Sequence, residues 1–206
     1  MSSLHGGIML SAEKSLARLK EGNRRFLSGE LTGLATFGPK DREQLVIGQH
    51  PFAVILGCSD SRVPIELLFD QGFGDLFVIR IAGNVVARSQ LGSVEYAIQE
   101  LGVKLVVVMG HAHCGAVAAA IAASRDGITP NAEHLNYVVQ KIMPSLMLDG
   151  EDPETILDNC IQANSRRSAQ SLASESIIIK NHIEQEDVRV LPAHFSIKTG
   201  EVEFLD

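Results

Sequence analysis

Residues 105–115 read LVVVMGHAHCG and residues 52–62 read FAVILGCSDSR, two apolar runs that each end in a glycine followed by reactive side chains. Within them, Phe52–Leu56 and Leu105–Met109 are short and apolar without alternation, which is typical of strands buried on both faces. Leu76–Ile81 has the same character. Helical patterns separate the three runs, so the sequence predicts parallel βαβ units and an α/β fold.

The flanking segments predict helices that cover a parallel-core sheet and a hairpin that extends it. The predicted helices are Ser11–Ser28, a short one near Asp41–Ile47, Pro64–Leu68, Ser89–Leu101 closed by Gly102, Ala112–Ser124, and most of Pro153–Glu186. The tail alternates over Val188–Ile197 and Val202–Leu205 around a turn at residues 198–200, which is typical of a hairpin at the sheet edge.

No linker, charge block or internal repeat divides the chain, so we expect one domain over residues 1–206. Its parts are an N-terminal helical arm (1–40), a metal-binding βαβ core (50–125), and helices with the C-terminal hairpin (150–206).

Composition narrows the class of protein. The 206 residues are 45% hydrophobic and 21% charged, as in ordinary soluble globular domains. A formal net charge of −7 disfavours a general nucleic-acid binder. The first residues lack a basic, then apolar, leader pattern, and Leu105–Met109 is far too short to span a membrane. Three cysteines, an odd and low number, disfavour a disulfide scaffold. We therefore expect a cytoplasmic protein without nucleic-acid or membrane partners.

Cysteine and histidine side chains follow two of the predicted strands. Cys58 comes directly after the first strand, and His111 and Cys114 follow the third. Because ligands bind beyond the carboxyl ends of parallel strands, these side chains are expected to converge at one edge. Two thiolates and an imidazole suit zinc, and three protein ligands leave a fourth position open. Cys58 alone fits a small buried residue equally well, and Cys160, without such neighbours, is predicted to be a packing residue.

Three further side chains lie within the same two motifs. Asp60 and Arg62, two residues apart in a tight turn, suit a bidentate carboxylate–guanidinium pair, either as a structural ion pair or as part of a site. Beside a metal, Asp60 has two options: to bind the ion as a fourth ligand, or to bind Arg62 and leave that position to water. His113 offers a competing imidazole, although an outward-facing loop histidine is the favoured interpretation.

The motifs CSDSRVP (58–64) and GHAHCG (110–115) resemble those of the β-class carbonic anhydrases, zinc enzymes that interconvert carbon dioxide and bicarbonate. The resemblance covers most of the chain, since four more segments are similar to family segments: LKEGNRRF (19–26), FVIRIAGNVV (77–86), SVEYAIQELG (93–102) and TGEVEFL (199–205). The pair of zinc motifs is highly specific, whereas the other segments are weak by themselves.

The resemblance implies a role for each matching residue. Cys58, His111 and Cys114 would be the zinc ligands, and Asp60 with Arg62 the family's dyad, Asp60 binding zinc only in a closed state. The residues at substrate-pocket positions would be Gln49, Phe77, Ala82, Tyr96 and Gly115. Without the resemblance, Gln49 is typical of a surface amide, and Phe77 and Tyr96 are typical of core residues.

The activity implied by the resemblance is zinc-dependent, reversible hydration of carbon dioxide to bicarbonate and a proton, by attack of zinc-bound hydroxide. It also implies a homodimer or a higher even homo-oligomer, with the N-terminal helix packed across a partner subunit. Two alternatives stay open: hydrolysis of carbonyl sulfide or carbon disulfide at the same site, and a non-catalytic zinc-binding protein. A cysteine phosphatase is disfavoured because no arginine follows Cys114 within residues 115–120.

Overall fold

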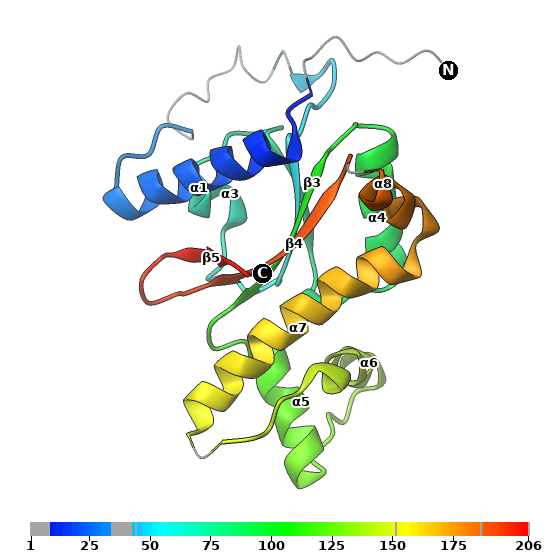
Figure 1. Ribbon diagram of the computed structural model, residues 1–206. Helices are drawn as coiled ribbons and strands as arrows, with labels where there is room; N and C mark the ends of the chain where they lie inside the picture. The colour runs from blue at the N-terminus through cyan, green and yellow to red at the C-terminus, as the bar shows by residue number, and fades with distance from the viewer. Residues whose placement is uncertain (1–8, 34–42, 44, 151, 186, 206) are drawn as a thin grey trace.

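Five strands form one mixed sheet in the computed structural model, which describes residues 9–33, 43, 45–150, 152–185 and 187–205 (Figure 1). The order is β2-β1-β3-β4-β5, with the first four strands parallel and β5 antiparallel to β4. The strands are β1 (Ala53–Gly57), β2 (Leu76–Arg80), β3 (Leu105–His111), β4 (Arg189–Phe195) and β5 (Val202–Phe204). This mostly parallel sheet, flanked by helices and preceded by an N-terminal helix, confirms the predicted fold class.

The two central strands explain the apolar runs that predicted them. Every residue of β1 and β3 is buried, because each strand pairs on both sides and helices cover both faces of the sheet. One face packs against α1 (Ala12–Ser28) and α3 (Ile65–Leu68). The other packs against α4 (Arg88–Gln99), α7 (Pro153–Glu175) and α8 (Ile177–Glu184), on the opposite side of the sheet in Figure 1.

A third apolar cluster lies beyond the carboxyl ends of the strands. It is formed by α5 (Gly115–Asp126), α6 (Glu133–Ile142), the start of α7, and the cysteines at positions 58 and 114. The helix α6 and the short 3-10 helix Met143–Ser145 that follows it are additions to the predicted elements. The carboxyl edge of the sheet is therefore covered, and a site placed there is partly enclosed.

Two predicted boundaries are wrong, each for a local reason. The helix predicted from Ala112 begins at Gly115, because His113 has a left-handed backbone (φ 56°) and Cys114 is extended. β3 in turn continues to His111, since its pairing with β4 extends that far. The prediction that most of Pro153–Glu186 is helical is confirmed, and the stretch divides into two helices at Ser176, which is extended and caps α8.

Three other predictions concern the end of α4, the C-terminal hairpin and a short helix before β1. The helix α4 ends at Gln99 with Glu100 as its C-cap, so Gly102, at φ 67°, lies beyond the cap instead of forming it. The C-terminal hairpin lies at one edge of the sheet as predicted, with β5 as the edge strand and β4 next to it. Of the short helix predicted near residues 41–47, positions 41, 42 and 44 lie outside the described residues, and Glu43 and Leu45 are helical.

The N-terminal helix packs one face on the sheet of its own chain, and its packing across a partner subunit stays a prediction. Its predicted N-cap is observed, since Ser11 accepts a hydrogen bond from the amide of Lys14. Leu19 is fully buried in the sheet core, and Asn23 bonds the backbone at positions 68, 200 and 202. A Cβ at Gly22 would lie 1.8 Å from the carbonyl oxygen of Phe69, so the close approach requires glycine there. Within the described residues, no helix has the length and apolarity to cross a membrane.

A buried carboxylate fastens the segment after α1 to the core. Asp70 is 1% exposed and forms an ion pair with Arg25. It also accepts hydrogen bonds from the amide and hydroxyl of Thr32 (2.9 and 3.0 Å) and from the amide of Gly33 (2.7 Å). Burial opposes ionisation, but these donors outweigh it and hold the pKa of Asp70 below its usual range.

Replacing Asp70 by Ala should lower the free energy of unfolding by about 3 kcal/mol, because Arg25 and two backbone amides lose a buried acceptor. Since the folded-state pKa lies below the unfolded-state value, this stabilisation is complete above about pH 4 and is lost as the pH falls through the folded-state pKa. Urea unfolding of both proteins over a pH series measures the difference. The exposed Asp149→Ala should change stability little; an equal loss in both variants would contradict the assignment.

Candidate metal centre

Two cysteines and a histidine meet at the carboxyl edge of the sheet. The ligand atoms of Cys58, His111 and Cys114 lie within 4.8 Å of one another, and all three residues are buried. Each is positioned by a different element, since Cys58 directly follows β1, His111 is the last residue of β3, and Cys114 is the N-cap of α5. The register pairs Gly57 with Met109, so Cys58, directly after β1, and His111, at the end of β3, lie at the ends of adjacent strands.

The imidazole of His111 is oriented as a ligand. Its Nδ1 lies 2.9 Å from the carbonyl oxygen of Ala112, which favours the proton on Nδ1 and leaves a lone pair on Nε2. Nε2 is fully buried and has no hydrogen-bond partner among the described residues. A buried nitrogen of this kind is costly unless something satisfies it, and a metal ion aligned with its lone pair would do so.

The two thiols complete a donor set for a soft divalent ion. A hydrogen bond from the thiol of Cys114 lowers the pKa of Cys58 to about 4 in spite of burial, and the same interaction raises the pKa of Cys114. The pair therefore holds one proton between its two sulfur atoms. A divalent cation would take the place of this proton and allow both groups to be thiolates. Two sulfurs and one imidazole nitrogen fit a zinc-type ion.

Asp60 binds an arginine at the border of the three-ligand cluster. Arg62 donates to both carboxylate oxygens from Nε (2.9 Å) and Nη2 (2.7 Å), and its amide donates to Oδ1 (3.0 Å). This partner holds the pKa of Asp60 well below its usual range, so the group is ionised at neutral pH. Its Oδ2 nevertheless lies 3.8 Å from Nε2 of His111. An oriented carboxylate thus borders the site without being one of its three clustered ligands.

An arginine that the sequence analysis missed fixes the loop that carries Cys58 and Asp60. The guanidinium of Arg80 donates to the carbonyl oxygen of Cys58 (3.1 Å) and to that of Asp60 (2.6 Å). Arg80 is the last residue of β2 and pairs with Gly57, so it shares the edge at which the site forms. The sequence could have predicted this role for Arg80. Ligands bind beyond the carboxyl ends of parallel strands, and this reasoning, which selected Cys58 after β1, applies equally to a charged residue at the end of β2.

Two of the five predicted pocket residues lie close to the metal ligands in sequence and fold. Ala82 opens the 3-10 helix Ala82–Asn84, whose Gly83 amide donates to Sγ of Cys58 (3.3 Å). Gly115 is the first residue of α5, immediately after Cys114, and a Cβ there would meet no atom within 4 Å. The approach over Gly115 is therefore open space.

The other three pocket residues lie elsewhere in the chain. Phe77 pairs with Val54 in the first half of β1, three residues before the end of the paired segment, and its ring contacts that of Tyr96 at 6.1 Å between centroids. Tyr96 is half exposed on α4. Gln49 is exposed and precedes the amino end of β1. Within one chain, these three do not join the metal ligands at the carboxyl edge.

His113 and Cys160 both lie outside the cluster of three ligands. His113 is exposed, lines a cavity of about 80 Å³ with residues of α7, and accepts a hydrogen bond from Arg62 on its carbonyl oxygen (3.2 Å). Cys160 is fully buried in α7, where its Sγ contacts the amide and carbonyl of Met147, both at 3.3 Å. Cys160 therefore has the surroundings of a packing residue.

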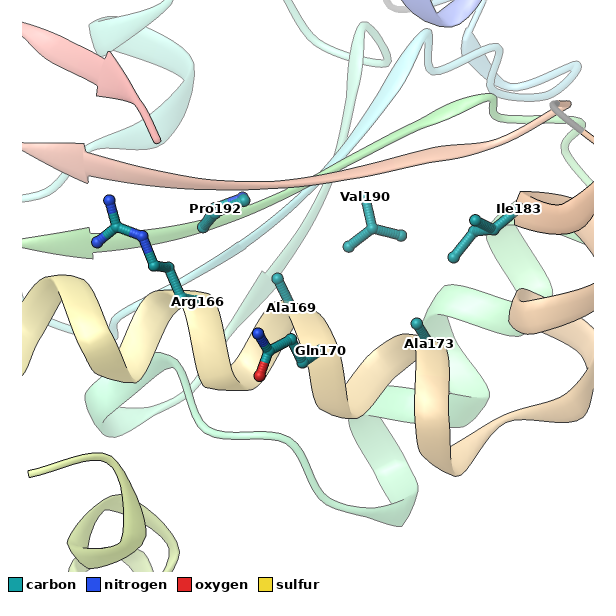
Figure 2. Close-up of a pocket in the computed structure, with 7 residues that line it drawn as sticks. All are labelled: Arg166, Ala169, Gln170, Ala173, Ile183, Val190 and Pro192. Carbon is teal, nitrogen blue, oxygen red and sulfur yellow. The ribbon is translucent and has the colours of Figure 1, made fainter. Parts of the chain in front are cut away.

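A groove of about 310 Å³ lies between α7, α8 and β4 (Figure 2). Its floor is apolar and one arginine lies at its end, the lining residues being Arg166, Ala169, Gln170, Ala173, Ile183, Val190 and Pro192. None of these residues belongs to the cluster of three ligands or contacts Asp60 in the structure described. The groove is therefore separate from the candidate metal centre.

Comparison with known proteins gives consistent relatives. Residues 53–202 match the family model described as carbonic anhydrase. The chain is 40% identical over 182 residues to carbonic anhydrase 2 of Mycobacterium tuberculosis, covering 88% of this chain and 87% of that protein. It is 36% identical over 185 residues to a carbonic anhydrase of Mycolicibacterium smegmatis, covering 90% and 89%. Among solved structures, the β-carbonic anhydrase CcaA matches with a TM-score of 0.75 and 26% identity, covering 93% of this chain and 92% of that one.

Proposed function

Because this chain belongs to the β-class carbonic anhydrase family, we propose that it catalyses the reversible hydration of carbon dioxide to bicarbonate and a proton, with zinc held by Cys58, His111 and Cys114. The observation that carries the proposal is the buried cluster of these three ligands beside an ionised, arginine-bound carboxylate. When bound, the metal supplies a Lewis acid that makes water nucleophilic near neutral pH. Free thiols at the site suit a reducing compartment, which supports a cytoplasmic location.

In this proposal, Asp60 orients the attacking water. Its Oδ2 faces the ligand cluster and is ionised, so it accepts a hydrogen bond from the water and aims the water's lone pair at the carbon of carbon dioxide. Arg62 keeps this carboxylate from turning onto the metal by engaging both of its oxygens. Arg80 holds the backbone on both sides of Ser59, so Cys58 and Asp60 keep a fixed relative position.

The direct test is stopped-flow hydration of carbon dioxide by the purified chain, together with its zinc content. We expect one zinc per chain and rapid hydration. Cys114→Ala should lose both, because it removes a ligand, whereas Cys160→Ala removes a buried thiol away from the cluster and should keep both. Parallel assays with carbonyl sulfide and carbon disulfide distinguish the related hydrolases. Zinc binding without turnover of any of the three substrates would indicate a non-catalytic zinc protein and contradict the proposal.

The role given to the Asp60–Arg62 pair predicts a loss of turnover without loss of metal. In Arg62→Ala, Asp60 loses its bidentate partner and is free to bind the metal, so kcat should fall by about 100-fold or more while zinc content is unchanged. Arg24→Ala is the matched control, since it removes another close arginine–carboxylate pair at the surface of α1. Near-normal rates in Arg62→Ala would show that the pair is merely structural.

The separated pocket residues support assembly with a second copy. Gln49, Phe77 and Tyr96 lie away from the ligand cluster of their own chain. The strand β2, which contains Phe77, is an edge strand of the sheet. Val46 and Ile47, which closely precede Gln49 in the sequence, are 87% and 91% exposed. We propose a homodimer or a higher even oligomer in which the partner supplies these three residues to the site. Gel filtration with light scattering should show the oligomer; an active monomer at dilute concentration would exclude this arrangement.

A further inference from the structure

A buried hydrogen-bonded chain runs from α7 to one of the metal-ligating sulfur atoms. The amide of Gly83 donates to Sγ of Cys58 (3.3 Å), and the carbonyl oxygen of the same residue accepts a hydrogen bond from Nδ2 of Asn164 (2.8 Å). Asn164 is 1% exposed, and its Oδ1 lies 3.4 Å from the hydroxyl of Ser145. The side-chain amide of Asn164, on a helix distant in sequence, is thus linked to the sulfur of Cys58 through a single residue, Gly83.

The turn that carries Gly83 needs support from outside. Gly83 and Asn84 both have left-handed backbones, with φ of 66° and 42°, which is unfavourable for the non-glycine residue. A Cβ at Gly83 would lie 2.7 Å from Cδ1 of Ile142, so no side chain at that position can anchor the turn. The bond from Asn164 is the described side-chain contact that holds the Gly83 carbonyl.

Packing alone does not account for an amide at position 164. Its neighbours on α7 include Cys160 and Ile161, which belong to the apolar cluster around the site, together with Ile142 of α6. A leucine, which has the same number of side-chain non-hydrogen atoms and the same branching, would satisfy this environment without the cost of burying a polar group. The amide is therefore suited to holding the Gly83 peptide.

We propose that Asn164 is a positioning residue of the metal centre, which aims the amide of Gly83 at Cys58 and so sets how strongly that thiolate binds the metal. A hydrogen bond to a ligating sulfur holds it in position to bind the metal, so its loss weakens metal binding; it also withdraws electron density from the sulfur, which makes the bound metal more electron-poor. Partners of this kind around metal ligands change metal affinity or activity by about 10- to 100-fold. The inference rests on the proposed zinc centre and adds to it a residue that does not touch the metal.

The test compares Asn164→Leu and Asn164→Ser with Cys160→Ala in the full-length chain. Leucine removes the hydrogen bond and keeps the branched shape of the side chain, and serine leaves room for water to replace the bond in part. Cys160→Ala is the matched control, because it removes a buried hydrogen-bonding group one turn earlier on the same helix. The readouts are the thiolate-to-metal charge-transfer absorption of the cobalt-substituted protein, the zinc dissociation constant by chelator competition, and kcat and KM separately.

For Asn164→Leu, we expect a displaced charge-transfer band, a zinc dissociation constant raised about 10-fold, and a fall in kcat with little change in KM. Asn164→Ser should change in the same direction by less, and it decides the question if the leucine variant does not fold. A folded variant with the band and zinc affinity of Cys160→Ala would overturn this inference alone. A wild-type chain without a thiolate band would overturn the metal centre itself.

Discussion

The parallel pairing of β1 with β3 is the constraint on which the rest of the site depends. Its register places Gly57 opposite Met109, so that Cys58 and His111 emerge within two residues of each other at one edge of the sheet. A shift of one residue would turn either ligand to the opposite face. The positions of His111 and Cys58 then fix those of their neighbours. Cys114 lies three residues after His111, in the tight turn before α5, and Asp60 lies two residues after Cys58.

The centre balances its charges locally. Two thiolates, an ionised Asp60 and a divalent ion would be surrounded by two guanidinium groups, Arg62 on the carboxylate and Arg80 on the backbone carbonyls. A small uncharged substrate needs no long-range attraction, so an acidic chain of net charge −7 is compatible with this chemistry. The apolar cluster buries Cys58 and Cys114, whereas the Asp60–Arg62 pair beside them stays partly exposed to solvent.

Sequence reasoning succeeded where a local pattern has one structural meaning. Runs without polar alternation predicted the buried strands, and reactive residues after two of them predicted a site at the carboxyl edge. It failed where backbone conformation decided the outcome, as in the left-handed His113 that delays α5. It could not supply the anchors of α1, which lie far along the chain: Ser15 donates to the carbonyl of residue 52, and Asn23 accepts from the amide of residue 202.

The sequence by itself determined the fold class, the family resemblance, and the identity of the residues proposed as ligands and dyad, because these follow from residue types at short spacing. The tertiary structure decided the state of Asp60, the support from Arg80, and the position of Asn164, which lies 81 residues from its partner Gly83. It also separated Phe77 and Tyr96 from the ligands of their own chain. The reason is physical: a hydrogen bond or a shared pocket between distant segments depends on which backbone groups the packed elements bring within about 3 Å, and no local pattern records that distance.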